Sequence, residues 1–239
     1  MNNRNIVGAF LLGALVCIGL IVLGYQLAQG IIHIKSLDRT VTVKGLSERE
    51  VPANVAIWPI TFQEAGNDLN QLFSTIQKNN ERVVRFLENR GFKPEEISVS
   101  PPGILDKQAE GYAGTQQIKF RYSGNSTITV YSEKVDDVRK AMNELVELGK
   151  QGIAIARSNY QTQTEFLYTK LNEIKPGMIE EATKNAREVA EKFARDSNSR
   201  LGKIKTARQG QFSINHRDNN TPHIKNVRVV STIEYYLSD

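Results

Sequence analysis

The chain has 239 residues, of which 40% are apolar and 24% are charged, and its 31 basic and 26 acidic residues give a formal net charge of +5. This composition excludes disordered, collagen-like and low-complexity chains, and the single cysteine excludes a disulfide framework or a cysteine-rich zinc module. The small charge excess is not the concentrated basic patch expected of a nucleic-acid-binding protein, so nucleic acid is not an expected partner.

The first segment of the chain, Ile6 to Ala28, is apolar over twenty-three residues. At about 1.5 Å per residue it would form a helix of roughly 34 Å, which is enough to cross a hydrocarbon core of about 30 Å. A secretory signal peptide usually has a shorter apolar stretch, although Ala28-Gln29-Gly30 resembles a cleavage site. We predict a membrane anchor with a short linker over residues 1–35, and a cleaved signal peptide is the alternative. The anchor residues include Ile6, Phe10, Leu15, Leu20 and Ala28.

The charges that flank this segment do not determine its orientation, because Arg4 precedes it and Lys35 and Arg39 follow it. A short amino-terminal tail before a long carboxyl-terminal domain is typical of an anchor whose amino terminus stays inside the cell. We therefore predict an inner (cytoplasmic) membrane protein of a Gram-negative cell, with residues 36–239 in the periplasm. If the segment is cleaved, the protein would be secreted to the periplasm.

In chain order, alternating apolar residues first predict strands at Val41–Val43 and Ala56–Phe62, and Pro59 indicates an edge or a bulge. The spacing of apolar residues then predicts a helix over 69–87, capped by Asn67 or Asp68 and ended by Gly91. Alternation returns over 118–122 and 128–130. A second helical stripe follows over 135–146, opened by Ser132 and closed by Gly149.

Short alternating runs predict strands at 153–155 and 166–168. A third helix is predicted over 179–194, after the Pro176-Gly177 breaker, and the last strand is predicted over 227–237. Strand-rich runs broken by single helices predict an α+β protein. Its antiparallel sheet or sheets would carry three helices packed on one side, in a domain over 36–239 that is single or made of two interleaved subdomains.

Three segments of the chain resemble the SIMPL-domain family. They are RTVTVKGLSEREVPANVAIWPITF (39–62), YSGNSTITVYSEKVDDVRKA (122–141) and an alanine ladder followed by LGKI (201–204). The family includes exported bacterial proteins related to an oxidative-stress defence protein and to an immunogenic envelope protein. The resemblance implies export, and it implies self-assembly because at least one member forms a large ring-like or cage-like oligomer. It implies no catalytic residues, cofactor or ligand.

The residues suited to chemistry do not form a recognisable catalytic site. His216 and His223 flank a loop that contains Asp218, but their separation has no regular ligand geometry, so we expect solvated loop histidines rather than a metal site. Three acids, Glu64, Asp106 and Glu110, are either neighbours in the fold or scattered surface groups. No nucleophile elbow, P-loop or dinucleotide-binding motif is present. We predict no cofactor, no metal and no enzymatic activity.

Two sets of residues are candidates for contacts with other molecules. Alanines every fourth residue form a smooth stripe that either packs on the chain's own sheet or contacts another subunit, and the final strand is a candidate for pairing across subunits if it lies at an edge. These interface candidates are Ala182, Ala186, Ala190, Ala194, Val230 and Tyr236. A basic stretch either is a solvated surface or contacts anionic lipid headgroups. Its members are Lys192, Arg195, Arg200, Lys203, Lys205 and Arg208.

Three functions are compatible with the sequence. The first is a non-catalytic, membrane-anchored envelope protein that self-assembles as a scaffold or compartment, with a role in stress tolerance implied by the resemblance alone. The second is a periplasmic module that binds a lipid or a small molecule. The third is an enzyme with an unrecognised site. Expected partners are membrane lipid, through the anchor, and further copies of the chain.

Overall fold

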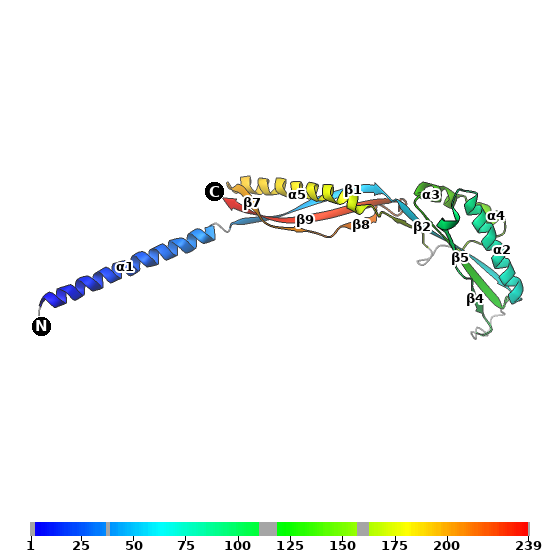
Figure 1. Cartoon of the computed structure of the whole chain (residues 1–239), viewed down its shortest axis with the longest axis horizontal. Coiled ribbons are helices and arrows are strands. Elements are labelled where there is room, and N and C mark those ends of the chain that lie inside the picture. The colour runs from blue at the N-terminus through cyan, green and yellow to red at the C-terminus, as the bar shows by residue number, and fades with distance from the viewer. Residues whose placement is uncertain (1–2, 37–38, 110–118, 157–162, 239) are drawn as a thin grey trace. The chain divides into compact units, whose positions relative to one another are not determined.

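The computed structural model describes residues 3–36, 39–109, 119–156 and 163–238 as an α+β protein with two antiparallel sheets (Figure 1). The helices are α1 (Asn3–Ser36), α2 (Leu69–Glu88), α3 (Val135–Asn143), α4 (Val146–Lys150) and α5 (Leu171–Asp196), with a 3-10 turn η1 (Pro94–Glu96). The strands are β1 (Thr40–Pro52), β2 (Val55–Gly66), β3 (Ile97–Val99), β4 (Gly103–Asp106), β5 (Tyr122–Ser132), β6 (Glu165–Leu167), β7 (Arg200–Gln209), β8 (Ser213–His216) and β9 (Ile224–Ser238).

The chain divides into two compact units, each built from segments that are distant in the sequence. The first unit comprises Met1–Glu48, Lys175–Ser213 and Arg228–Asp239, and the second comprises Arg49–Ile174 and Ile214–Val227. Each unit has its own hydrophobic core. Each unit is therefore described by its own contacts.

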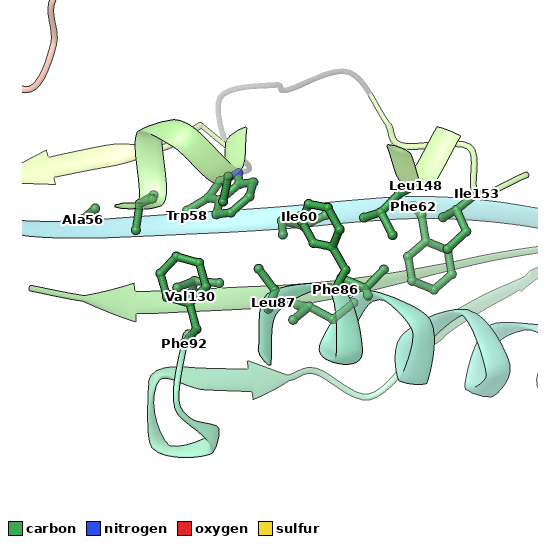
Figure 2. Packing of buried hydrophobic residues seen from close by; sticks show 14 of the residues in the cluster. Ala56, Trp58, Ile60, Phe62, Phe86, Leu87, Phe92, Val130, Leu148 and Ile153 are labelled. Atoms are coloured by element: carbon green, nitrogen blue, oxygen red, sulfur yellow. The ribbon is translucent and has the colours of Figure 1, made fainter. Parts of the chain in front are cut away.

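The core of the second unit lies between one face of its sheet and the helices α2, α3 and α4. The strand order in this sheet is β3-β5-β2-β6, and β4 also pairs with β5. Trp58, Ile60 and Phe62 alternate along β2 and point to the same side (Figure 2), where each is at most 2% exposed. Pairing of Ile60 with Ile128 sets the register that adds the buried residues of β5 to this core. The predicted alternation of β2 is confirmed.

Helix α2 begins and ends where its sequence predicts. The Asp68 side chain accepts a hydrogen bond from the Gln71 amide at 2.8 Å, which satisfies an amide that the first helical turn leaves unpaired. Gly91 follows the helix with φ +83°, a conformation that favours glycine. The apolar positions of the helix, among them Leu72, Ile76 and Val83, are buried in the core.

In the first unit, α5 packs on a sheet whose central strand is β9, flanked by β1 and β7 (Figure 1). Strand β8 also pairs with β9. The approach of α5 to β1 depends on Gly45, because a Cβ atom there would lie 1.8 Å from the Ala182 carbonyl oxygen and 2.5 Å from the Ala186 nitrogen. The absence of a side chain at Gly45 therefore permits the helix to lie directly against the strand.

Three predicted boundaries are wrong, each for a local reason. Helix α5 begins at Leu171 and contains Pro176, whose ring removes one backbone donor in the second turn without ending the helix. The second helical stripe is divided into α3 and α4, and its left-handed stop is Gly152, with φ +84°, rather than Gly149. The hydroxyl of Ser132 accepts from the Lys134 amide at 3.1 Å, so it lies in the turn before α3 rather than at its cap.

The strand predictions also need correction around the second sheet. The two strands expected near 118–122 and 128–130 are one strand from Tyr122 to Ser132, and Ile118 lies outside the described residues. Pro59 lies in β2 between the short pairing with β6 at 55–57 and the isolated bridge from Phe62 to Ile155. Proline has no backbone N–H to donate to a neighbouring strand. Pro59 therefore fits a position of β2 where the described pairing is with β5 alone.

Candidate functional site

The alanine stripe is covered by the chain's own sheet. Ala182, Ala186, Ala190 and Ala194 are each at most 2% exposed. Ala186 and Ala190 share a core cluster with Val43, Ile233 and Tyr235 of the sheet. The expectation that this stripe contacts another subunit is therefore corrected, because small side chains here permit close packing of helix on strand within one chain.

The final strand is not at an edge. Strand β9 lies between β1 and β7, so its backbone groups are engaged on both sides and it does not offer an edge for pairing across subunits. Its alternation places Ile233 and Tyr235 towards α5 and Val230, Glu234 and Tyr236 on the opposite face. Val230 and Tyr236 therefore do not lie on an edge that is open for strand pairing.

That opposite face carries three partly exposed apolar side chains. A hydrogen bond of 2.8 Å from the Leu237 amide to the Arg39 carbonyl, and an ion pair of 3.6 Å between Arg228 and Glu48, are compatible with one register of β1 on β9, which places Leu46 opposite Val230. Leu46 and Tyr236 are each 38% exposed, and Val230 is half-buried. Tyr236 lies six residues from Val230, about 20 Å along the strand, and the polar Thr232 and Glu234 lie between them on this face. We call Leu46, Val230 and Tyr236 the open-face residues.

The six basic residues predicted to contact headgroups do not form one surface. The register of β7 on β9 places Arg200, Lys205 and Arg208 on the face away from α5, while Lys203 lies on the α5 side. Lys205 is 3.5 Å from Glu234 and 5.6 Å from the ring centre of Tyr236, so its charge is partnered. Lys192 and Arg195 are exposed on α5. The six residues therefore lie on more than one surface of the first unit, and their contact with lipid headgroups stays a prediction.

A groove of about 440 Å³ runs between α5 and β7 in the first unit. Its α5 wall includes Lys184 and Arg187, its β7 wall includes Lys203 and Ile204, and Tyr235 of β9 also lines it. The remaining lining residues are Glu180, Thr183 and Gly202. Among these residues, only Lys203 was a candidate from the sequence. A turn separates α5 from β7, so the sequence alone does not show that the basic residues of α5 lie beside β7. We call this feature the α5–β7 groove.

His216 and His223 lie in the second unit, and His216 contacts a buried lysine that the sequence did not single out. Lys225 is 5% exposed, and its Nζ lies 2.7 Å from Nδ1 of His216, which is also 3.0 Å from the Pro222 carbonyl oxygen. Burial lowers the pKa of Lys225, and the nearby charge of Glu165 opposes that shift. Buried residues alternate along β9, and Lys225 lies two residues before the buried Val227. This alternation was the sequence signal that could have predicted the burial of Lys225. The Nδ1 of His216 is thus occupied by protein groups.

His223 and Asp218 also have structural partners. The ring of His223 lies edge-on to Phe166, with 6.1 Å between ring centres, and burial lowers its pKa. Asp218 accepts hydrogen bonds from the amides of Asn220 and Thr221, each at 2.8 Å, and from the Thr221 hydroxyl. The Thr221 hydroxyl and Arg217 lower the pKa of Asp218, so this carboxylate organises its own loop. Within the described ranges, no three histidine, cysteine or acidic residues gather as metal ligands.

The acids noted in the sequence are not brought together as a pair of reacting groups. Arg121 lies 2.8 Å from Asp106 and lowers the pKa of that carboxyl by hydrogen bonding. Glu64 accepts a hydrogen bond of 2.7 Å from the buried Asn79 side chain. Glu110 lies outside the described residues. Both described acids therefore have a stabilising neighbour of their own.

The amino-terminal helix contains a stretch, Leu12–Ile31, that is long and apolar enough to cross a membrane, and none of it is buried in the chain. Leu15, Leu20 and Ala28 are exposed there. Helix α1 also includes Ile6 and Phe10. By length and composition alone, both a membrane anchor and a signal sequence fit this helix.

The family model described as SIMPL, protein of unknown function (DUF541), matches residues 41–230. The chain therefore belongs to the SIMPL family, as its sequence resemblance predicted. No curated protein matches the sequence significantly. The matched range ends within β9 and begins at the second residue of β1, so it includes segments of both compact units.

Proposed function

We propose that this protein is a non-catalytic SIMPL-domain protein, tethered by α1 to the inner membrane of a bacterial cell, whose domain lies in the periplasm and self-assembles there. The observation that carries the proposal is the exposed apolar stretch Leu12–Ile31, which is followed by the domain after a linker of a few residues. A tether restricts the chain to two dimensions and raises its local concentration, which favours association of identical subunits. A scaffold or compartment, with a part in stress tolerance, is the proposed role.

The open-face residues support self-assembly through a sheet face. Leu46 and Tyr236 are each 38% exposed, the Glu48–Arg228 and Lys205–Glu234 pairs lie on the same face, and a mixture of apolar and charged side chains is common in protein interfaces. Strand addition at the outer edge of β1 is less favourable, because Asn185 donates a hydrogen bond of 2.8 Å to the Leu46 carbonyl and so blocks that acceptor. We therefore place the proposed contact between subunits on the sheet face.

The size of the detergent-solubilised full-length protein tests self-assembly. We expect an oligomer in the wild type, and we expect Tyr236→Arg to reduce it to a monomer that remains folded, because a second cation beside Lys205 would be brought into the contact between subunits. Tyr131→Arg is the matched control, since Tyr131 is also an exposed strand tyrosine, 55% exposed, but lies in the other sheet. A monomeric wild type at high concentration, or equal dissociation of both variants, would contradict assembly through this face.

A second candidate function, binding of a small molecule or lipid, is favoured by the α5–β7 groove. Three cations and one acid line the groove together with the side chains of Ile204 and Tyr235. Convergent charge beside an apolar surface is a common arrangement in ligand sites. This candidate is compatible with tethering and with assembly, because the groove and the open-face residues lie on opposite faces of the sheet.

A further inference from the structure

The charge of the α5–β7 groove is largely unneutralised. Among the described residues, Lys184 and Lys203 form no ion pair, and Glu180 is the one acid in the lining. Arg187 is 3.6 Å from Glu191, but both side chains are more than half exposed, and such exposed pairs are weak. The groove lining therefore carries three cationic residues against one acidic residue, which favours an anionic ligand.

The rest of the lining suits the atoms that adjoin an anionic group. Ile204 is 48% exposed, so it offers apolar surface that the fold itself leaves uncovered. Tyr235 also lines the groove, but it is 2% exposed and packs in the core beneath α5. The lining thus combines cations with an aliphatic side chain, which fits a phosphate ester with a carbon chain attached.

Chain connectivity places this groove at the tethered end of the sheet. Ser36 ends α1, and three Cα–Cα steps, at most about 11 Å, lead to Arg39. The Arg39 carbonyl accepts from the Leu237 amide at 2.8 Å, and Leu237 is paired with Leu201. The groove residues Gly202–Ile204 follow Leu201 directly, and Tyr235 precedes Leu237 by two residues. The β7 wall of the groove therefore begins within a few residues of the strand end that follows α1.

We propose that the α5–β7 groove binds the phosphate of an anionic phospholipid headgroup through Lys184, Arg187 and Lys203. This inference rests on the proposed tether for its choice of a lipid source. A free phosphate or soluble phosphate ester has the same anionic chemistry, and the experiment below distinguishes the two sources. Binding here would hold the first unit against the membrane surface and would limit the orientations that the short linker allows.

The test is lipid binding by full-length protein in a non-ionic detergent, measured by native mass spectrometry with added phosphatidylglycerol or phosphatidylcholine. We expect preferential retention of phosphatidylglycerol. Because each cation near an anionic headgroup contributes about fivefold in affinity, we expect a loss of roughly tenfold to a hundredfold in the variant Lys184→Gln, Arg187→Gln, Lys203→Gln. The matched control, Lys78→Gln, Lys150→Gln, Lys170→Gln, removes three exposed cations of the second unit and should retain the lipid. Thermal melting verifies that both variants are folded.

A parallel titration with inorganic phosphate and glycerol 3-phosphate identifies the source of the anion. Retention of phosphatidylglycerol without a response to millimolar phosphate supports the lipid headgroup. A response to the soluble anions alone, lost in the groove variant, supports the anion site but overturns the lipid source. Equal lipid retention by the groove variant and the control overturns the proposal. Cleavage of α1 in cells would contradict the tether, whereas the phosphate titration would still report on the groove, so the two failures are distinguishable.

Discussion

Replacing Gly45 by alanine is expected to unfold the first unit or to separate α5 from its sheet. The added Cβ would lie 1.8 Å from the Ala182 carbonyl oxygen, and the atoms that it meets first are backbone atoms of a long helix, which cannot rotate away. Overpacking of this kind costs about 1–3 kcal/mol and often more, and displacement of α5 would also expose the buried alanine stripe. We expect a loss of at least about 3 kcal/mol in the free energy of unfolding.

The measurement is chemical denaturation of the full chain, with hydrogen exchange of the α5 amides to locate the loss. Gly149→Ala is the control, because a Cβ at this helical position meets nothing within 4 Å and should be neutral or slightly stabilising. Wild-type stability and wild-type α5 protection in Gly45→Ala would contradict the packing of the helix on β1.

Replacing Phe62 by alanine is expected to have the largest effect in the second unit. Phe62 is fully buried, and it lies near Leu148 and Ile153 in a core that three helices and β2 share (Figure 2). Truncation of a buried phenylalanine removes apolar contact and leaves a cavity, at a cost of about 3–5 kcal/mol. A denaturation midpoint shifted without a change in slope would report this loss.

Tyr131→Ala provides the comparison for Phe62. Tyr131 lies on β5, the strand paired with β2, but its side chain is 55% exposed, so its removal should change stability by less than about 1 kcal/mol. Similar losses in both variants would mean that the two faces of this sheet are not distinguished as the structure describes.

The sequence predicts well those elements whose signals are local. Helix α2 has a regular apolar spacing, a capping carboxylate at Asp68 and a left-handed Gly91, and each of these acts within a few residues. The boundaries of α5 were missed because tertiary packing of the alanine stripe overrides the local effect of Pro176. The short strands β3, β4 and β8 lack a run long enough to show a period of two.

The site residues were harder to predict because their neighbours come from distant segments. The position of β9 between β1 and β7 cannot be inferred from its own alternation, so the sequence could offer edge pairing only as a conditional candidate. The α5–β7 groove likewise depends on the register of β7 with β9, which contains irregularities between Leu201 and Thr206. Only the family resemblance and the apolar first segment gave functional information from the sequence alone, because neither depends on how the strands pair.

In the proposed function, α1 remains part of the mature protein and holds the domain at the membrane. The most direct measurement is the intact mass of carboxyl-terminally tagged protein recovered from carbonate-washed membranes. The tether predicts a membrane-bound chain whose mass corresponds to the full 26.8 kDa sequence plus the tag. A soluble product that lacks the first thirty residues would contradict the tether and establish the cleaved-signal alternative.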